Sequence, residues 1–130
     1  MNGDNPEFIN RAATDFLHAK SLELFGGLTG VRDDGLVESA LASAQNVWLY
    51  AGGDLFDIAA AYAFHLSHAQ AFFDGNKRTG VSVALTFLEI NGVDCPQDDG
   101  RIYDALIAIA ERRMDKADLA RVLRDWLTAQ

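Results

Sequence analysis

Five consecutive residues, Asp74-Gly75-Asn76-Lys77-Arg78, bring together one carboxylate, one glycine, one amide and two cations. They precede an apolar segment with helical spacing, so they would lie at the start of a helix. The first backbone N–H groups of a helix lack partners within it, and the helix dipole adds partial positive charge there. Such a helix start binds phosphate readily. The pattern therefore predicts a site for a phosphorylated ligand.

The residue types suit different parts of such a site. Gly75 lets the backbone approach an anion and adopt a positive φ. Lys77 and Arg78 place positive charge where acidic side chains are normally favoured, and a broken local rule often marks a functional site. Asp74 is a candidate Mg²⁺ ligand, because Mg²⁺ is usually held by one or two carboxylates together with substrate phosphates. On these residues alone, an ordinary turn followed by solvated cations is the simpler interpretation, and the Gly-x4-Gly-Lys-Ser/Thr loop is absent.

The surrounding chain predicts helices joined by short connections. Asn5-Pro6 is a typical helix start, and this first helix should end at Gly26-Gly27. Further helices are expected from Asp33 or Asp34 to about Tyr50, from a cap at Asp54, from near Asn76 to Asn91-Gly92, over 99–111 and over 116–128. Residues 93–96 could form a very short strand. The helix after Asn76 is apolar nearly all round, which is typical of a central, buried helix.

Composition narrows the class of protein. The 130 residues suit a single domain over 1–130 with its own hydrophobic core. The net charge of −8 argues against a nucleic-acid partner or an anionic membrane surface. The single cysteine, Cys95, excludes an internal disulfide and a cysteine-based zinc site and fits a reducing compartment. No secretory signal or membrane-spanning run is visible, so we expect a cytoplasmic protein.

Residues 71–79, Ala-Phe-Phe-Asp-Gly-Asn-Lys-Arg-Thr, followed by an apolar helix ending in Leu-Glu-Ile-Asn-Gly-Val, resemble the active-site loop of the Fic/Doc (Fido) superfamily. That loop reads His-x-Phe-x-Asp/Glu-Gly/Ala-Asn-Gly/Lys-Arg, and Phe72 and residues 74–78 fall in register. Residues 25–41 and 54–62 are similar to the corresponding segments of the Doc (death-on-curing) branch. Lys77 stands where adenylylating Fic proteins commonly have glycine, and Val81 stands where they often have a second arginine. Both residues therefore favour a resemblance to Doc.

This resemblance implies an all-α Fido-type bundle of about six helices around one central buried helix. The active-site loop would lie between the third and fourth long helices, at the mouth of a nucleotide cleft. Phe72 would anchor the loop. The implied ligand contacts are Mg²⁺ at Asp74, an anion nest at Gly75, Asn76 and Lys77, and a distal phosphate at Arg78.

The resemblance also implies an activity. Fic proteins use ATP to transfer AMP to a protein hydroxyl, whereas Doc transfers the γ-phosphate to elongation factor Tu. Doc is the toxin of a toxin–antitoxin pair and is silenced by an antitoxin, Phd in the best-known case. We therefore expect an ATP-dependent phosphotransferase or adenylyltransferase with a Phd-like antitoxin and a protein target in the translation machinery.

The family histidine falls at position 70, where this chain has Gln70. The histidine is the general base for the attacking hydroxyl. A glutamine amide cannot accept that proton, although its oxygen accepts hydrogen bonds. His68 is no obvious substitute, because at about 100° per residue positions 68 and 70 point roughly 200° apart on a helix. His18, His65 and His68 are expected to be structural or surface residues.

The loss of the base leaves two functions to compare. Nucleotide and Mg²⁺ binding should survive in an impaired transferase, because positioning and electrostatics supply most of phosphoryl-transfer catalysis. The alternative is a non-catalytic module on the same fold that binds a nucleotide or a partner.

Overall fold

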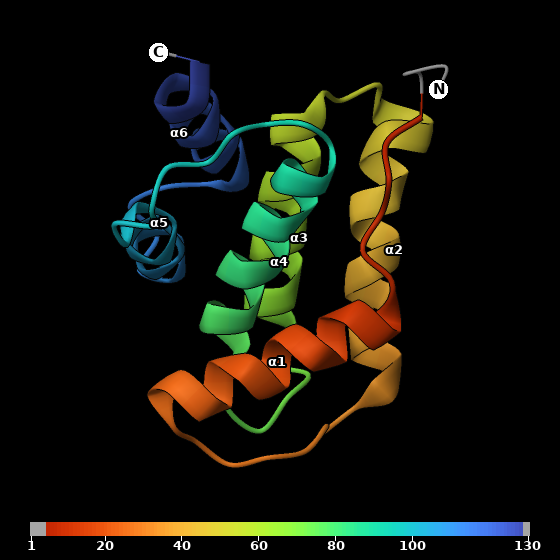
Figure 1. The fold of residues 1–130 in the computed structure, drawn as a ribbon, viewed down its shortest axis with the longest axis vertical. Helices are drawn as coiled ribbons and strands as arrows, with labels where there is room; N and C mark the ends of the chain where they lie inside the picture. The colour runs from red at the N-terminus through yellow and green to blue at the C-terminus, as the bar shows by residue number, and fades with distance from the viewer. Residues whose placement is uncertain (1–4, 129–130) are drawn as a thin grey trace.

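The computed structural model describes residues 5–128, and these residues form an all-helical bundle (Figure 1). The helices in chain order are α1 (Arg11–Phe25), α2 (Asp34–Ala51), α3 (Leu55–Ala69), α4 (Asn76–Ile90), α5 (Arg101–Ala110) and α6 (Lys116–Thr128). The only strand-like pairing among these residues is an isolated antiparallel bridge between Val31 and Phe72. The predicted all-α fold is confirmed. None of the described helices is long and apolar enough to cross a membrane.

Two helices, α3 and α4, share the centre of the bundle. They run side by side in Figure 1, with α2 on one side, α5 and α6 on the other, and α1 crossing their lower end. The apolar helix α4 is buried as predicted, but α3 packs against α2, α4, α5 and α6. Gly80 allows α4 to approach α3 closely, since a Cβ there would lie 2.7 Å from the Ala63 carbonyl oxygen.

Acidic caps begin α2 and α3, and the cap at Asp54 is the one that was predicted. The Asp33 carboxylate accepts a hydrogen bond from the Leu36 N–H, and Asp54 forms a capping box with Asp57. Each cap satisfies N–H groups that would otherwise lack a partner at the helix start. The start of α4 has no such cap, and this difference matters for the site described below.

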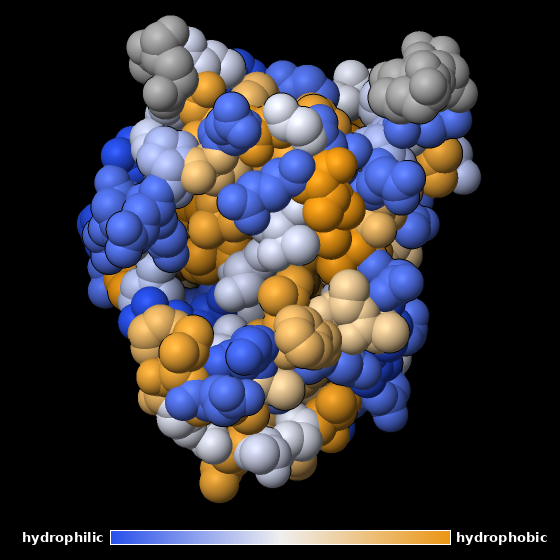
Figure 2. Space-filling model, viewed as in Figure 1, coloured by the Kyte–Doolittle hydropathy of each residue, from blue (hydrophilic) through white to orange (hydrophobic). Residues whose placement is uncertain are grey.

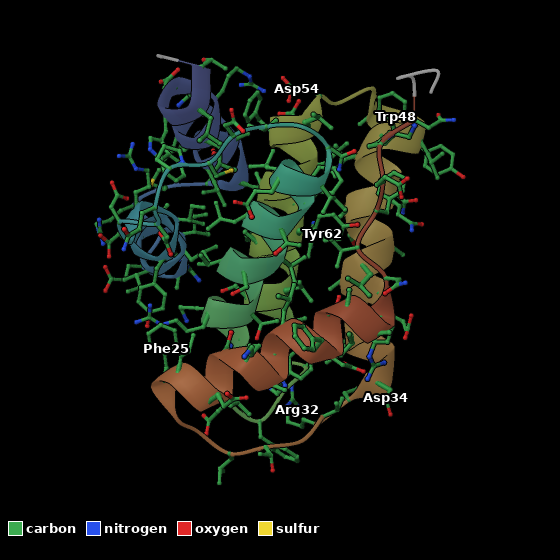
Figure 3. All side chains as sticks on the ribbon, viewed as in Figure 1. Phe25, Arg32, Asp34, Trp48, Asp54 and Tyr62 are labelled. Atoms are coloured by element: carbon green, nitrogen blue, oxygen red, sulfur yellow. The ribbon has the colours of Figure 1, made fainter. Side chains whose placement is uncertain are left out.

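The predicted helix start at Asn5-Pro6 is wrong. Helix α1 begins at Arg11 with Asn10 as its cap, because the Asn10 side chain accepts a hydrogen bond from the Ala13 N–H. The preceding residues are held by tertiary contacts instead. The Ile9 N–H donates to the Tyr62 hydroxyl at 3.0 Å, and the Tyr62 side chain lies beside this segment (Figure 3).

Asn91 closes α4 and ties the N-terminal segment to it. Its Nδ2 donates to the carbonyl oxygens of Phe87 and Glu7, and its Oδ1 accepts from the Glu7 N–H. Helix α4 therefore ends at Ile90, as the Asn-Gly stop predicts. The short strand considered for residues 93–96 does not form, because no neighbouring strand is available among residues 5–128.

Candidate active site

The α3–α4 loop, residues 70–75, lies at the lower end of the bundle beside the α1–α2 loop, residues 26–33 (Figure 1). Backbone hydrogen bonds join the two loops. The Phe73 N–H donates to the Gly30 carbonyl at 3.3 Å, and the Arg32 N–H donates to the Ala71 carbonyl at 2.7 Å. The two loops are about forty residues apart in sequence, and the tertiary fold places them side by side.

Phe72 and Asn76 hold the loop from inside. The Phe72 side chain is fully buried in the core. The Asn76 amide bonds the Phe72 backbone twice, with Oδ1 accepting from the N–H at 3.1 Å and Nδ2 donating to the carbonyl at 3.0 Å. The Asn76 side chain therefore fixes the loop, and its backbone N–H is available to an anion.

His18 of α1 supports the same loop. Its ring stacks on Phe72 with centroids 3.8 Å apart, and its Nε2 lies 2.8 Å from the Asp74 carbonyl oxygen. The sequence indicates only a structural or surface histidine at this position and does not predict this contact. The buried residues of α1 are Thr14, His18 and Ser21, whose i, i+4, i+7 spacing was an available sign that a polar face of α1 points inward.

The start of α4 presents free backbone donors. Gly75 adopts a left-handed conformation with φ 80°, and no side chain caps this helix end. The Thr79 N–H bonds the Gly75 carbonyl, so the N–H groups of Asn76, Lys77 and Arg78 precede the first intrahelical bond. Together with the helix dipole, these donors form an anion-binding end.

These donors face a cavity of about 550 Å³, lined by Gln70, Asp74, Gly75, Asn76, Lys77 and Arg78 together with residues of α1, its following loop and α5. Its size lies within the range of about 300–1,000 Å³ that is usual for ligand pockets. Neither Lys77 nor Arg78 forms an ion pair with any of residues 5–128. Lys77 and Arg78 therefore place two positive charges without ion-pair partners in the lining of this cavity, although the protein as a whole is acidic.

Asp74 lines the cavity with a single carboxylate. Its Oδ2 accepts a hydrogen bond from the Leu28 N–H at 2.7 Å, which fixes the side chain and leaves Oδ1 unbonded. No group of three or more His, Cys, Asp or Glu side chains among residues 5–128 could hold a metal ion. The donor set fits Mg²⁺ bound jointly by one carboxylate and by phosphate oxygens, as is usual for this ion.

Gln70 ends α3 in the left-handed conformation, with φ 55°. The Arg32 guanidinium bonds its carbonyl oxygen, with Nε at 2.8 Å, and Arg32 lies beside the loop in Figure 3. The Gln70 Nε2 donates to the Ser67 carbonyl at 3.0 Å. Backbone and side chain are therefore both fixed at position 70, where the resemblance implies a histidine.

The predicted angle of roughly 200° between His68 and Gln70 is wrong, because it assumes that both residues are helical. Gln70 lies outside helix α3. Both residues line a second cavity of about 510 Å³, which also shares Lys77 with the first. His68 does not line the first cavity and stacks on Phe64 with centroids 5.2 Å apart. The backbone donors at the start of α4 therefore have no imidazole of His65 or His68 beside them in the cavity.

Comparison with known proteins identifies the family of the chain. The profile of the Fic/DOC family matches residues 8–88. The chain is 38% identical over 127 residues to "Toxin Doc" of Mycolicibacterium smegmatis, covering 95% of each chain. It is 32% identical over 109 residues to "Protein kinase doc" of Escherichia phage P1, covering 83% of this chain and 86% of that protein. The chain belongs to the Fic/DOC family.

Proposed function

We propose that the protein is a Doc-like toxin that transfers a phosphoryl group from ATP to a hydroxyl of a protein target such as elongation factor Tu. The observation that carries this proposal is the uncapped start of α4, where three backbone N–H groups and two unpaired cations face a cavity of about 550 Å³. The relatives named as a toxin and as a protein kinase support the same activity.

In this proposal the residues divide the work of phosphoryl transfer. The backbone N–H groups of Asn76 and Lys77 and the Lys77 ammonium bind phosphate oxygens, and Arg78 binds the distal phosphate. Asp74 would hold Mg²⁺, which would neutralise part of the phosphate charge. The target hydroxyl oxygen forms a bond to the γ-phosphorus, the bond to the ADP oxygen breaks so that ADP leaves, and the hydroxyl proton passes to solvent water.

Gln70 does not supply the general base that this reaction needs. Its Nε2 already donates to Ser67, so its Oε1 is the atom left to orient an incoming hydroxyl. That oxygen accepts a hydrogen bond but not the proton itself. A positioned general base typically contributes about 10²–10⁴-fold to the rate. We infer that transfer is reduced by about this factor while ATP binding is retained.

We propose that the γ-phosphate is transferred, and not AMP. Lys77 stands where adenylylating Fic proteins commonly have glycine, and one relative is named a kinase. ATP labelled on the γ-phosphorus should label the target, and ATP labelled on the α-phosphorus should not. The reverse result would assign AMP transfer.

The proposed regulatory partner is a Phd-like antitoxin with a segment that folds as a helix in a groove. Large apolar side chains are exposed where α1 ends and its loop begins, with Leu24 at 75% and Leu28 at 68%. Figure 2 shows hydrophobic residues reaching the surface at the lower end of the molecule, where α1 ends in Figure 1. Coexpression with a short neighbouring antitoxin gene should restore growth to cells that the toxin inhibits.

A direct experiment compares this protein with its Gln70→His variant. Calorimetry should give similar MgATP affinities, and transfer to elongation factor Tu should rise about 10²–10⁴-fold in the variant. Growth inhibition by Gln70→His should disappear in the double variant with Arg78→Ala. Arg121→Ala, which removes an exposed arginine from α6, is the matched control.

The second candidate function is a non-catalytic binding module, and the absence of a proton acceptor at Gln70 is the observation that favours it. ATP binding without transfer or toxicity, even in Gln70→His, would establish this module and reject the toxin. A chain that binds no MgATP would reject both nucleotide-dependent functions.

A further inference from the structure

The Arg78 guanidinium lies between two aromatic rings. Its Cζ is 4.0 Å from the ring centroid of Phe25 and 4.0 Å from that of Tyr103. The two rings make no contact with each other, so they approach the guanidinium from different sides. Phe25 is the last residue of α1 and lies at the end of that helix nearest α5 (Figure 3), whereas Tyr103 belongs to α5.

This aromatic bracket joins helices that are otherwise separate. Helices α1 and α5 do not pack against each other, although both line the cavity at the start of α4. Phe25, Arg78 and Tyr103 all belong to that lining. The guanidinium therefore contacts a side chain from each of these two walls of the cavity.

The bracket determines which part of Arg78 a ligand can reach. A guanidinium is planar, and its five N–H donors lie around its edge. Guanidinium planes stack on aromatic rings, and such stacking on Phe25 and Tyr103, each 4.0 Å from Cζ, leaves the edge open to a ligand. No hydrogen bond to residues 5–128 uses these donors. A planar edge of free donors suits two parallel hydrogen bonds to phosphate, which lysine cannot reproduce.

We propose that Phe25 and Tyr103 are positioning residues that fix the Arg78 guanidinium to bind the distal phosphate of the nucleotide and so favour ATP over ADP. This inference rests on the proposed function, because it takes ATP as the ligand of the cavity. It adds two residues from outside the α3–α4 loop, one on each wall. Both act through Arg78 and touch no reacting atom.

The test measures MgATP and MgADP affinities by calorimetry for Phe25→Leu and Tyr103→Leu of the full chain. Each variant loses one aromatic ring against the Arg78 guanidinium. The loss of one cation–aromatic contact corresponds to about a 2- to 30-fold change in affinity. We expect MgATP affinity to fall within this range and MgADP affinity to change much less, so that the ATP-to-ADP ratio falls. Phe25→Tyr and Tyr103→Phe retain a ring face and should restore the ratio.

Two controls separate positioning from folding. Leu24→Ala removes an exposed apolar neighbour that does not line the cavity and should leave both affinities unchanged. Thermal unfolding should show that Phe25→Leu is folded, because Phe25 is 59% exposed. If Tyr103→Leu does not fold, the comparison of Phe25→Leu with Phe25→Tyr decides the proposal.

The outcomes for this inference and for the proposed function are distinct. If Arg78→Lys weakens MgATP binding but the leucine variants bind like the original chain, the bracket has no positioning role. An equal loss of ATP and ADP affinity in the leucine variants would overturn the assignment to the distal phosphate. If the original chain binds no MgATP, or Arg78→Ala does not weaken it, the proposed function itself fails.

Discussion

The Nε2 atom of His18 lies 2.8 Å from the backbone carbonyl oxygen of Asp74. A carbonyl oxygen only accepts hydrogen bonds, so His18 carries its proton on Nε2 and donates it. The same ring stacks on Phe72. One side chain of α1 thus supports both the residue that anchors the loop and the residue whose carboxylate is the candidate Mg²⁺ ligand.

We expect His18→Phe to keep the stack on Phe72 and to lose the hydrogen bond. The Asp74 carbonyl would then lack its partner, which typically costs about 1–3 kcal/mol of the free energy of unfolding. Urea denaturation measures this loss, and calorimetry should show weaker MgATP binding. His68→Phe replaces an exposed imidazole and serves as control. Equal stability of the two variants would show that the hydrogen bond contributes nothing.

Position 70 should tolerate only residues that accept the left-handed conformation. We expect Gln70→Val to lower the free energy of unfolding by about 1–3 kcal/mol, because a β-branched residue is strained at φ 55°. Gln70→Asn should be much less destabilising, since asparagine adopts this conformation readily. Histidine is also enriched there, so Gln70→His should fold normally. Similar denaturation midpoints for the Val and Asn variants would contradict the strained backbone.

The close approach of α3 and α4 at Gly80 predicts a sensitive core position. In Gly80→Ala the new Cβ would meet the Ala63 carbonyl oxygen at 2.7 Å, so the two helices would have to separate. Overpacking of this kind typically costs about 1–3 kcal/mol. Glu89→Ala, an exposed change on the same helix, should stay within about 0.5 kcal/mol. Denaturant unfolding checks both, and a Gly80→Ala variant as stable as the control would disprove the tight contact.

His65 provides a prediction for pH dependence. Burial, followed by the positive charge of Lys116 and the nearby His68, lowers the pKa of His65 to about 4. The Lys116 ammonium lies 3.3 Å from His65 Nε2. Unfolded histidine has a pKa of about 6.5. The unfolded chain therefore binds more protons between about pH 4 and 6.5, and stability should fall as the pH is lowered through this window.

Proton NMR titration of the His65 ring should give a midpoint near pH 4. Lys116→Met removes the neighbouring charge and should raise that midpoint, and His65→Gln should remove part of the acid dependence of unfolding. A midpoint near 6.5 in the original chain would contradict the effect of burial.

The amino-acid sequence alone was enough for the helical class, the helix start at Asp33 or Asp34, the Asp54 cap and the Asn91-Gly92 stop. Each of these depends on residues close together in the chain, where helical period and capping preferences act. The start of the first helix was mispredicted, because long-range hydrogen bonds from Tyr62 and Asn91 hold residues 7–9 outside it.

The resemblance also placed the residues from Asp74 to Arg78 at a helix start, because the motif is contiguous. The partners of that motif come from other parts of the chain: His18 and Phe25 from α1, Arg32 from the following loop, and Tyr103 from α5. Their contacts depend on how helices pack across the bundle, and no local period encodes that packing. Local chemistry therefore predicted the candidate phosphate-binding residues, whereas packing between distant segments determines which side chains surround Arg78 and Gln70.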